Sequence, residues 1–193
     1  MKNLIYLFVL LFLTSMIGCT SNDTIEQTIS EDDLLGVWNV SELYTENGTT
    51  GAYFDGQSVT GAYSGVGSDF DMTALFEENP NNFYTSGSFT FNGTISFLNE
   101  QLTTQQVVDS IPSFISPASW SLLDNTITFS NADEAVLSNI FYYSNDTLRL
   151  KSSINENILD ELNAEQIQQL NSVLNLSIDS LTVNADVYLT LTK

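Results

Sequence analysis

The stretch LTVNADVYLTL, residues 181–191, decides the fold. Every odd-numbered residue in it is Leu, Val or Ala, and every even-numbered residue is Thr, Asn, Asp or Tyr. Successive side chains of a β-strand point to opposite faces, so this alternation predicts a strand with one buried face. Because it lies near the end of the sequence, we expect it to be the closing strand of a sheet.

Shorter alternating segments occupy most of the chain before that strand, and turn-forming residues separate them. This pattern is typical of antiparallel strands joined by tight turns. The predicted turns are Glu78–Asn82, Asn92–Gly93, Asp124–Asn125 and Ser144–Asp146, with Asn-Gly as the strongest hairpin signal. The predicted strands are Val37–Thr45, Asp71–Phe76, Phe83–Phe91, Trp120–Leu123, Thr126–Ser130, Val136–Tyr143 and Thr147–Lys151.

Three other segments depart from this pattern. Apolar residues recur at helical spacing in Asn155–Leu174, which predicts an amphipathic helix before the last strand. Residues 98–119 are polar and contain two prolines, so we expect a long loop with a short helical turn around Gln105–Ile111. The Gly-rich residues 51–67 fit either a strand pair or a loop. The predicted class is all-β, with about eight strands and one helix.

The first eighteen residues have the order of a signal peptide: Lys2, the apolar run Leu4–Leu13, and a small residue before Cys19. The apolar run is too short to cross a bilayer of roughly 30 Å. Met16–Cys19 resembles the bacterial lipobox, which implies that Cys19 carries a lipid and becomes the first residue. The alternative is that Cys19 is an ordinary small residue of the signal segment. We expect a disordered tether over residues 19–33 and one domain over residues 34–193.

The charge balance is strongly acidic. After residue 18 the chain keeps 3 basic residues, Arg149, Lys151 and Lys193, against 24 acidic ones, which gives a net charge of −21. Nucleic acid is therefore an unfavourable partner, and anionic headgroups would repel this surface. We expect the lipid alone to hold the protein at the membrane, in the outer membrane of the cell envelope.

The residue counts also limit the chemistry. There is no histidine, and the one cysteine is assigned to acylation, so imidazole and thiolate catalysis or metal binding is excluded. We expect no cofactor and no metal. Paired carboxylates acting on a glycosidic bond are the remaining catalytic chemistry, and the candidate pairs are Asp69 with Asp71 and Glu77 with Glu78. Neither pair has the spacing of a calcium loop.

Several segments together resemble the lipocalin-like lipoproteins of Bacteroidetes and flavobacteria. They are Leu35-Gly36-Val37-Trp38, residues 87–94, residues 120–129 and residues 145–150, and the lipobox precedes them. The resemblance implies an up-and-down lipocalin-like (calycin) barrel. It also implies that Trp38, after Gly36, fills the closed end of the barrel under a basic side chain from the end of the last strand. Lys193 is the basic residue in that place. Trp38 as a plain core aromatic is the open alternative.

A lipocalin-like barrel implies a binding protein for a small apolar or uncharged ligand. We expect its mouth between Gly48 and Phe70 and between Gln101 and Ser119. Candidate mouth residues are Tyr53, Phe54, Tyr63 and Phe114, which are equally compatible with a role as core or loop aromatics. Two alternatives stay open: a barrel packed solid that serves a structural or interaction role at the envelope, and a carboxylate hydrolase.

Overall fold

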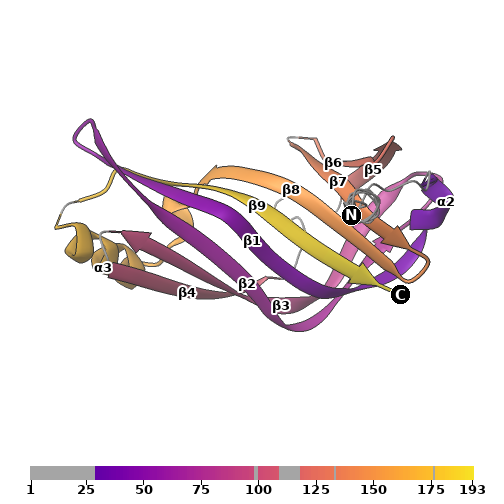
Figure 1. Ribbon diagram of the computed structural model, residues 1–193, viewed down its shortest axis with the longest axis horizontal. Coiled ribbons are helices and arrows are strands. Elements are labelled where there is room, and N and C mark those ends of the chain that lie inside the picture. Colours follow the sequence, from indigo (N-terminus) through magenta and orange to yellow (C-terminus); the bar gives the residue numbers. More distant parts are fainter. Residues whose placement is uncertain (1–28, 98–99, 109–117, 133, 176) are drawn as a thin grey trace, which may run out of the picture.

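The computed structural model describes residues 29–97, 100–108, 118–132, 134–175 and 177–193. The predicted fold class is confirmed: the described strands form an antiparallel, lipocalin-like barrel, with one short helix before the last strand (Figure 1). The expected signal peptide, Cys19 and Phe114 lie outside the described residues. The elements are α2 (Glu31–Leu34), β1 (Gly36–Phe54), β2 (Gln57–Phe76), β3 (Asn82–Phe97), β4 (Glu100–Val108), β5 (Ala118–Leu123), β6 (Thr126–Ser130), β7 (Ala135–Ser144), β8 (Thr147–Asn157), the 3-10 turn η1 (Leu159–Glu161), α3 (Ala164–Leu174) and β9 (Ser180–Thr192).

The sheet closes through strand β3, which has different neighbours along its length. One edge of β3 pairs with β2, and the order around the ring is β2, β1, β9, β8, β7, β6, β5 and back to β3. On its other edge, Asn82 and Phe83 pair with β5, whereas Phe89–Phe97 pair with β4. Strand β4 thus lies outside the closed ring and lengthens the wall at one end.

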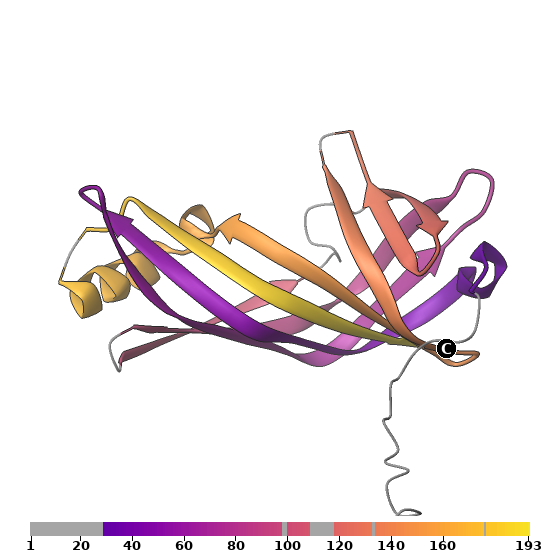
Figure 2. The same ribbon diagram turned by 45° about the horizontal axis from the view of Figure 1, so that its top comes forward.

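The short strands β5, β6 and β7 stand over the end of the barrel that holds α2 (Figure 2). This end is packed solid around aromatic rings: the centroid of Phe76 lies 5.0 Å from that of Phe83 and 5.4 Å from that of Trp120. Trp38, Leu34 and Leu191 complete the same buried cluster, which we call the α2-end core. Buried apolar residues from eight of the strands contribute to this core, so the α2 end is closely packed.

Helix α3 covers the opposite end (Figure 1). Strand β8 pairs with β7 only through Thr147–Lys151. Within the described part of the chain, the second half of β8 has no strand pairing on that edge, and it does not pair with β4, so the sheet is open between them. Leu170 and Leu174 of α3 pack there on Leu102 of β4 and Leu181 of β9, within a second buried cluster, the α3-end core. The alternation predicted for residues 181–191 is confirmed, since Leu181, Val183, Ala185, Leu189 and Leu191 are all buried.

The hairpin predicted at Asn92–Gly93 was wrong. Strand β3 runs straight through these residues, and Gly93 pairs with Gly65 of β2 and with Thr104 of β4. A Cβ on Gly93 would lie 2.9 Å from Thr104 Oγ1. Glycine is therefore needed here for close packing between strands and not for a turn. The turns expected at Glu78–Asn82, Asp124–Asn125 and Ser144–Asp146 are confirmed, because each lies between two paired strands.

The loop predicted for residues 98–119 was also wrong where it is described, because Glu100–Val108 is strand β4. Residues 51–67 form a strand pair, with the turn at Asp55–Gly56, where both residues have positive φ. Residues 48–70, which were expected at the mouth of the barrel, therefore belong to two strands of its wall and the turn that joins them. Residues 101–108 of the other expected mouth segment, Gln101–Ser119, also belong to a strand of the wall.

Two boundaries near the predicted helix and tether also change. Strand β8 continues to Asn157, and the helix begins only at Ala164, because Asn157 Oδ1 accepts hydrogen bonds from Leu159 N and Leu181 N at 3.1 Å and ties the chain to β9. At the other end, residues 29–33 belong to the folded body and not to a tether. Ile29 is buried in the α2-end core, and α2 begins at Glu31.

Candidate functional site

Trp38 lies in the α2-end core. Its side chain is fully buried, and its indole Nε1 donates a hydrogen bond of 2.7 Å to the carbonyl of Leu34. Lys193 Nζ lies 4.3 Å from the ring centroid, so the contact implied by the resemblance is present. Gly36 has a φ of +107°, a conformation that favours glycine where the chain passes from α2 into β1.

Hydrogen bonds connect the segment before Trp38 with strand β7 and with the residue that follows β9. Ser30 N and Oγ donate hydrogen bonds of 2.9 and 2.8 Å to the Asp33 carboxylate, and they hold the pKa of Asp33 below its ordinary value of 3.8. The Asp33 carbonyl accepts a hydrogen bond of 3.4 Å from Lys193 Nζ and one of 3.5 Å from the Tyr143 hydroxyl. Burial raises the pKa of Tyr143 above 10.0. The described chain thus begins and ends at this end of the barrel.

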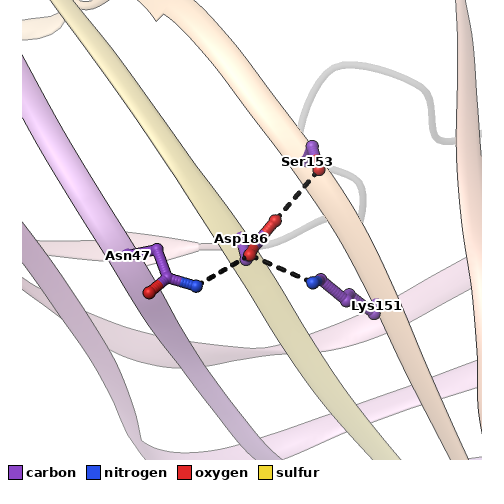
Figure 3. Close-up of polar contacts among 4 residues, drawn as sticks. All are labelled: Asn47, Lys151, Ser153 and Asp186. Carbon is purple, nitrogen blue, oxygen red and sulfur yellow. Dashed lines mark hydrogen bonds and ion pairs between the residues drawn. The ribbon is translucent and has the colours of Figure 1, made fainter.

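A polar cluster crosses β1, β9 and β8 at Asp186 (Figure 3). Its carboxylate accepts hydrogen bonds of 3.1 Å from Asn47 Nδ2 and from Ser153 Oγ, and it pairs with Lys151 Nζ at 3.0 Å. The hydrogen bond from Asn47 and the Lys151 ammonium lower the pKa of Asp186, and the same pairing raises the pKa of Lys151. The three contacts of the Asp186 carboxylate tie strands β1, β8 and β9 together.

The candidate acidic pairs lie open to solvent. Asp69 and Asp71 are exposed on strand β2, not in a loop, and the Asp69 carboxylate accepts a hydrogen bond of 3.0 Å from Ser68 Oγ. Glu77 and Glu78 are exposed in the turn that follows β2. Among the described residues, no three acidic or cysteine side chains come together in a way that could hold a metal ion.

A pocket of about 250 Å³ lies at the α3 end of the barrel. One wall comes from the paired strands β2, β3 and β4, and the other from residues that flank η1 and from the start of α3. None of the described residues that line the pocket carries a formal charge. The apolar lining residues are Phe91, Ile95, Ile158 and Leu162, and the polar ones are Tyr63, Thr104, Gln105, Asn163 and Gln166.

Two amides of this lining belong to the cap of helix α3. Asn163 Oδ1 accepts from Gln166 N at 3.0 Å, and Gln166 Oε1 accepts from Asn163 N at 2.8 Å. This reciprocal capping box uses both side-chain oxygens and keeps the two NH2 groups as donors. On the opposite wall, Gln105 Nε2 donates to Asn92 Oδ1 at 3.0 Å. The pocket can therefore offer hydrogen-bond donors beside an apolar surface.

Of the expected mouth residues that the structure describes, only Tyr63 lines this pocket. Tyr53 is 47% exposed on β1, and Phe54 is half-buried beside the β1–β2 turn. Sequence reasoning missed Thr104 and Gln105, which it placed in the long loop with a short helical turn that was expected over residues 98–119. One signal was visible: Asn163 and Gln166 have the spacing of a capping box.

A scan against protein-family models and a search of curated proteins find no match to this chain. The described helices include none that is long and apolar enough to cross a membrane.

Proposed function

We propose that this protein is a lipid-anchored binding protein of the bacterial envelope, related to lipocalin-like lipoproteins, and that the pocket under α3 takes a small, uncharged, partly apolar ligand. The pocket carries the proposal, because its described lining combines four apolar residues with amide and hydroxyl groups and includes no charged side chain. Binding sites for small molecules typically have this composition.

The size and charge of the molecule narrow the ligand class. A volume of about 250 Å³ is below the range of roughly 300–1,000 Å³ that is usual for drug-sized ligands. The excess of acidic residues, 24 against 4 basic ones, repels anions. The NH2 groups of Asn163 and Gln166 favour a ligand that carries a carbonyl, ether or hydroxyl oxygen.

The N-terminal arrangement supports display of the pocket away from the membrane. Ile29 is buried at the α2 end and lies ten Cα–Cα steps after Cys19, a distance of at most about 35 Å at full extension. Strand β1 joins the two ends of the barrel with Trp38 in the α2-end core and Ala52 in the α3-end core. At about 3.3 Å per residue, its nineteen residues span roughly 60 Å. A lipid on Cys19 would then hold the α2 end nearer the bilayer than the pocket.

We propose no catalytic role. The candidate carboxylates Asp69, Asp71, Glu77 and Glu78 are exposed, and none of them lines the pocket. A general acid for glycoside cleavage relies on a sheltered carboxyl group whose pKa is raised. Glycan hydrolysis that is abolished by Asp71→Asn would contradict this proposal.

The binding proposal is tested with the neutral fluorescent probe N-phenyl-1-naphthylamine and protein that begins at residue 20. We expect fluorescence enhancement with a Kd on the order of micromolar. Leu162→Trp, which fills the pocket from a half-buried position, should weaken binding at least about tenfold, a loss of about 1.4 kcal/mol. The matched control is Leu137→Trp, at a leucine that is 61% exposed on β7 and does not line the pocket.

Equal binding by the wild type and Leu162→Trp would place the probe elsewhere and reject the pocket. Complete absence of binding to the folded wild type would favour the alternative, an envelope protein whose barrel is packed solid. The close aromatic packing of the α2-end core is the feature that favours this alternative.

The anchor is tested separately in cells that express the full chain. We expect the wild type in the outer-membrane fraction and Cys19→Ser in the soluble fraction. Mass spectrometry of the native protein should show a diacylglyceryl group on Cys19 and loss of residues 1–18. A free thiol at Cys19 would refute the anchor and leave the binding proposal standing. Protease treatment of intact cells distinguishes the surface from the periplasmic face.

A further inference from the structure

Phe91 stands between the two buried halves of the barrel. On one side it packs against the α2-end core, and on the other it lines the pocket under α3. Phe89, two residues earlier on β3, belongs to the α2-end core and stacks on Phe70 at 5.4 Å between ring centroids. Ile95, four residues later, belongs to the α3-end core. The ring therefore lies at the boundary between packed interior and pocket.

A glycine on the neighbouring strand leaves the space that the Phe91 ring occupies. Gly65 of β2 and Gly93 of β3 are cross-strand partners, and Gly65 is buried. A Cβ on Gly65 would lie 2.1 Å from Phe91 Cζ and 2.8 Å from Cε2, and a Cβ on Gly93 would lie 3.6 Å from Cε1. The Phe91 ring thus packs directly on the backbone of Gly65, and any side chain at position 65 would displace it.

We infer that Phe91 is the floor of the pocket and sets the length of the longest ligand that fits. The inference rests on the proposed function, and it specifies the ligand class further: an uncharged amphiphile with a short apolar part that ends at the Phe91 ring and a polar oxygen near Asn163 and Gln166. A longer chain could enter the barrel only by displacing the ring into the packed α2-end core.

The experiment measures how straight-chain primary alcohols from butanol to dodecanol displace N-phenyl-1-naphthylamine from protein that begins at residue 20. For the wild type, affinity should rise about fourfold per methylene while added carbons are buried, and should then stop rising at a limiting length. In Phe91→Ala the space of the phenyl group becomes available, so the limit should move by at least two carbons. Alcohols beyond the wild-type limit should bind on the order of tenfold more tightly to this variant.

Phe70→Ala is the matched control. Phe70 also lies over a glycine, since a Cβ on Gly67 would be 2.5 Å from Phe70 Cζ, and it is half-buried but does not line the pocket. It should keep the wild-type limit. Phe91→Leu, a milder truncation, should shift the limit in the same direction and guards against poor folding of the alanine variant. Circular dichroism verifies the fold of each protein.

Gly65→Ala tests the same floor from the opposite side. Its new Cβ should drive the Phe91 ring off β2 and lower probe affinity about tenfold or more, a change that Phe91→Ala in the same chain should reverse because the clash is gone. An unchanged length limit in both Phe91 variants, with normal probe binding, would overturn the inference and leave the proposed function intact. Failure of the wild type to bind probe or alcohols would refute both.

Discussion

Removing the charge over the buried indole should reveal a measurable coupling between Lys193 and Trp38. Lys193→Met keeps most of the aliphatic stem but deletes the ammonium group, whose nitrogen lies 4.3 Å from the ring centroid. For an exposed cation this contact is worth about 0.5–1 kcal/mol. The same nitrogen donates to the Asp33 carbonyl at a long 3.4 Å, which adds at most about 1 kcal/mol. We expect Lys193→Met to lower the free energy of unfolding by about 1 kcal/mol.

A double-mutant cycle isolates the part that depends on the ring. Trp38→Leu should cost about 3 kcal/mol, because it truncates a fully buried side chain and leaves the Leu34 carbonyl without its 2.7 Å donor. The double variant should be less destabilised than the sum of the two single variants by about 0.5–1 kcal/mol. The assay is urea unfolding followed by circular dichroism, with the slope compared between variants.

Trp120 supplies the matched control for this cycle. It is also buried, and its Nε1 donates to the Glu77 carbonyl at 3.0 Å, but its ring packs edge-on against Phe76. Trp120→Leu combined with Lys193→Met should be additive within about 0.5 kcal/mol. If the Trp38 pair couples no more strongly than the Trp120 pair, the reasoning that Lys193 stabilises the barrel through the Trp38 ring is refuted.

Three further predictions concern the barrel wall, the α2 segment and the pocket cap. Gly87 has a φ of +90°, and an added Cβ would lie 1.7 Å from a β2 carbonyl oxygen, so Gly87→Ala should lower the free energy of unfolding in urea by about 3 kcal/mol. Gly56 has a φ of +74° but open space around it, so Gly56→Ala should lower it by only about 1 kcal/mol. Equal losses in the two variants would show that the clash at Gly87 does not matter. The pKa of Asp33 is lowered by Ser30, so its stabilisation should be complete above pH 3.8 and disappear as pH falls through the lower folded-state pKa. Asp33→Asn should remove that dependence from acid-unfolding curves, and an unaltered curve would contradict it. Asn163→Ala should lower the free energy of unfolding by about 1 kcal/mol and weaken probe binding, whereas a loss of stability alone would limit Asn163 to capping.

How well a segment could be predicted depends on how local its cause is. The alternation of residues 181–191 and the turns at Asp124–Asn125 and Ser144–Asp146 follow from the geometry of a few neighbouring residues, so the sequence was sufficient there. The Asn92–Gly93 prediction failed because a glycine in a strand can serve either a turn or the close approach of another residue. Only the position of the Phe91 ring and of Thr104 distinguishes the two.

Local patterns along the chain were enough to predict antiparallel strands with one apolar face, a helix before the last strand and a strongly acidic body. Tertiary structure alone decided where the interior stays open. The pocket brings Tyr63, Phe91, Thr104 and Asn163 together from four separate parts of the chain. It arises because β7 pairs with only half of β8 and leaves the α3 end to a helix. Strand alternation fixes which side chains point inward, but the extent of pairing between distant strands fixes whether they meet.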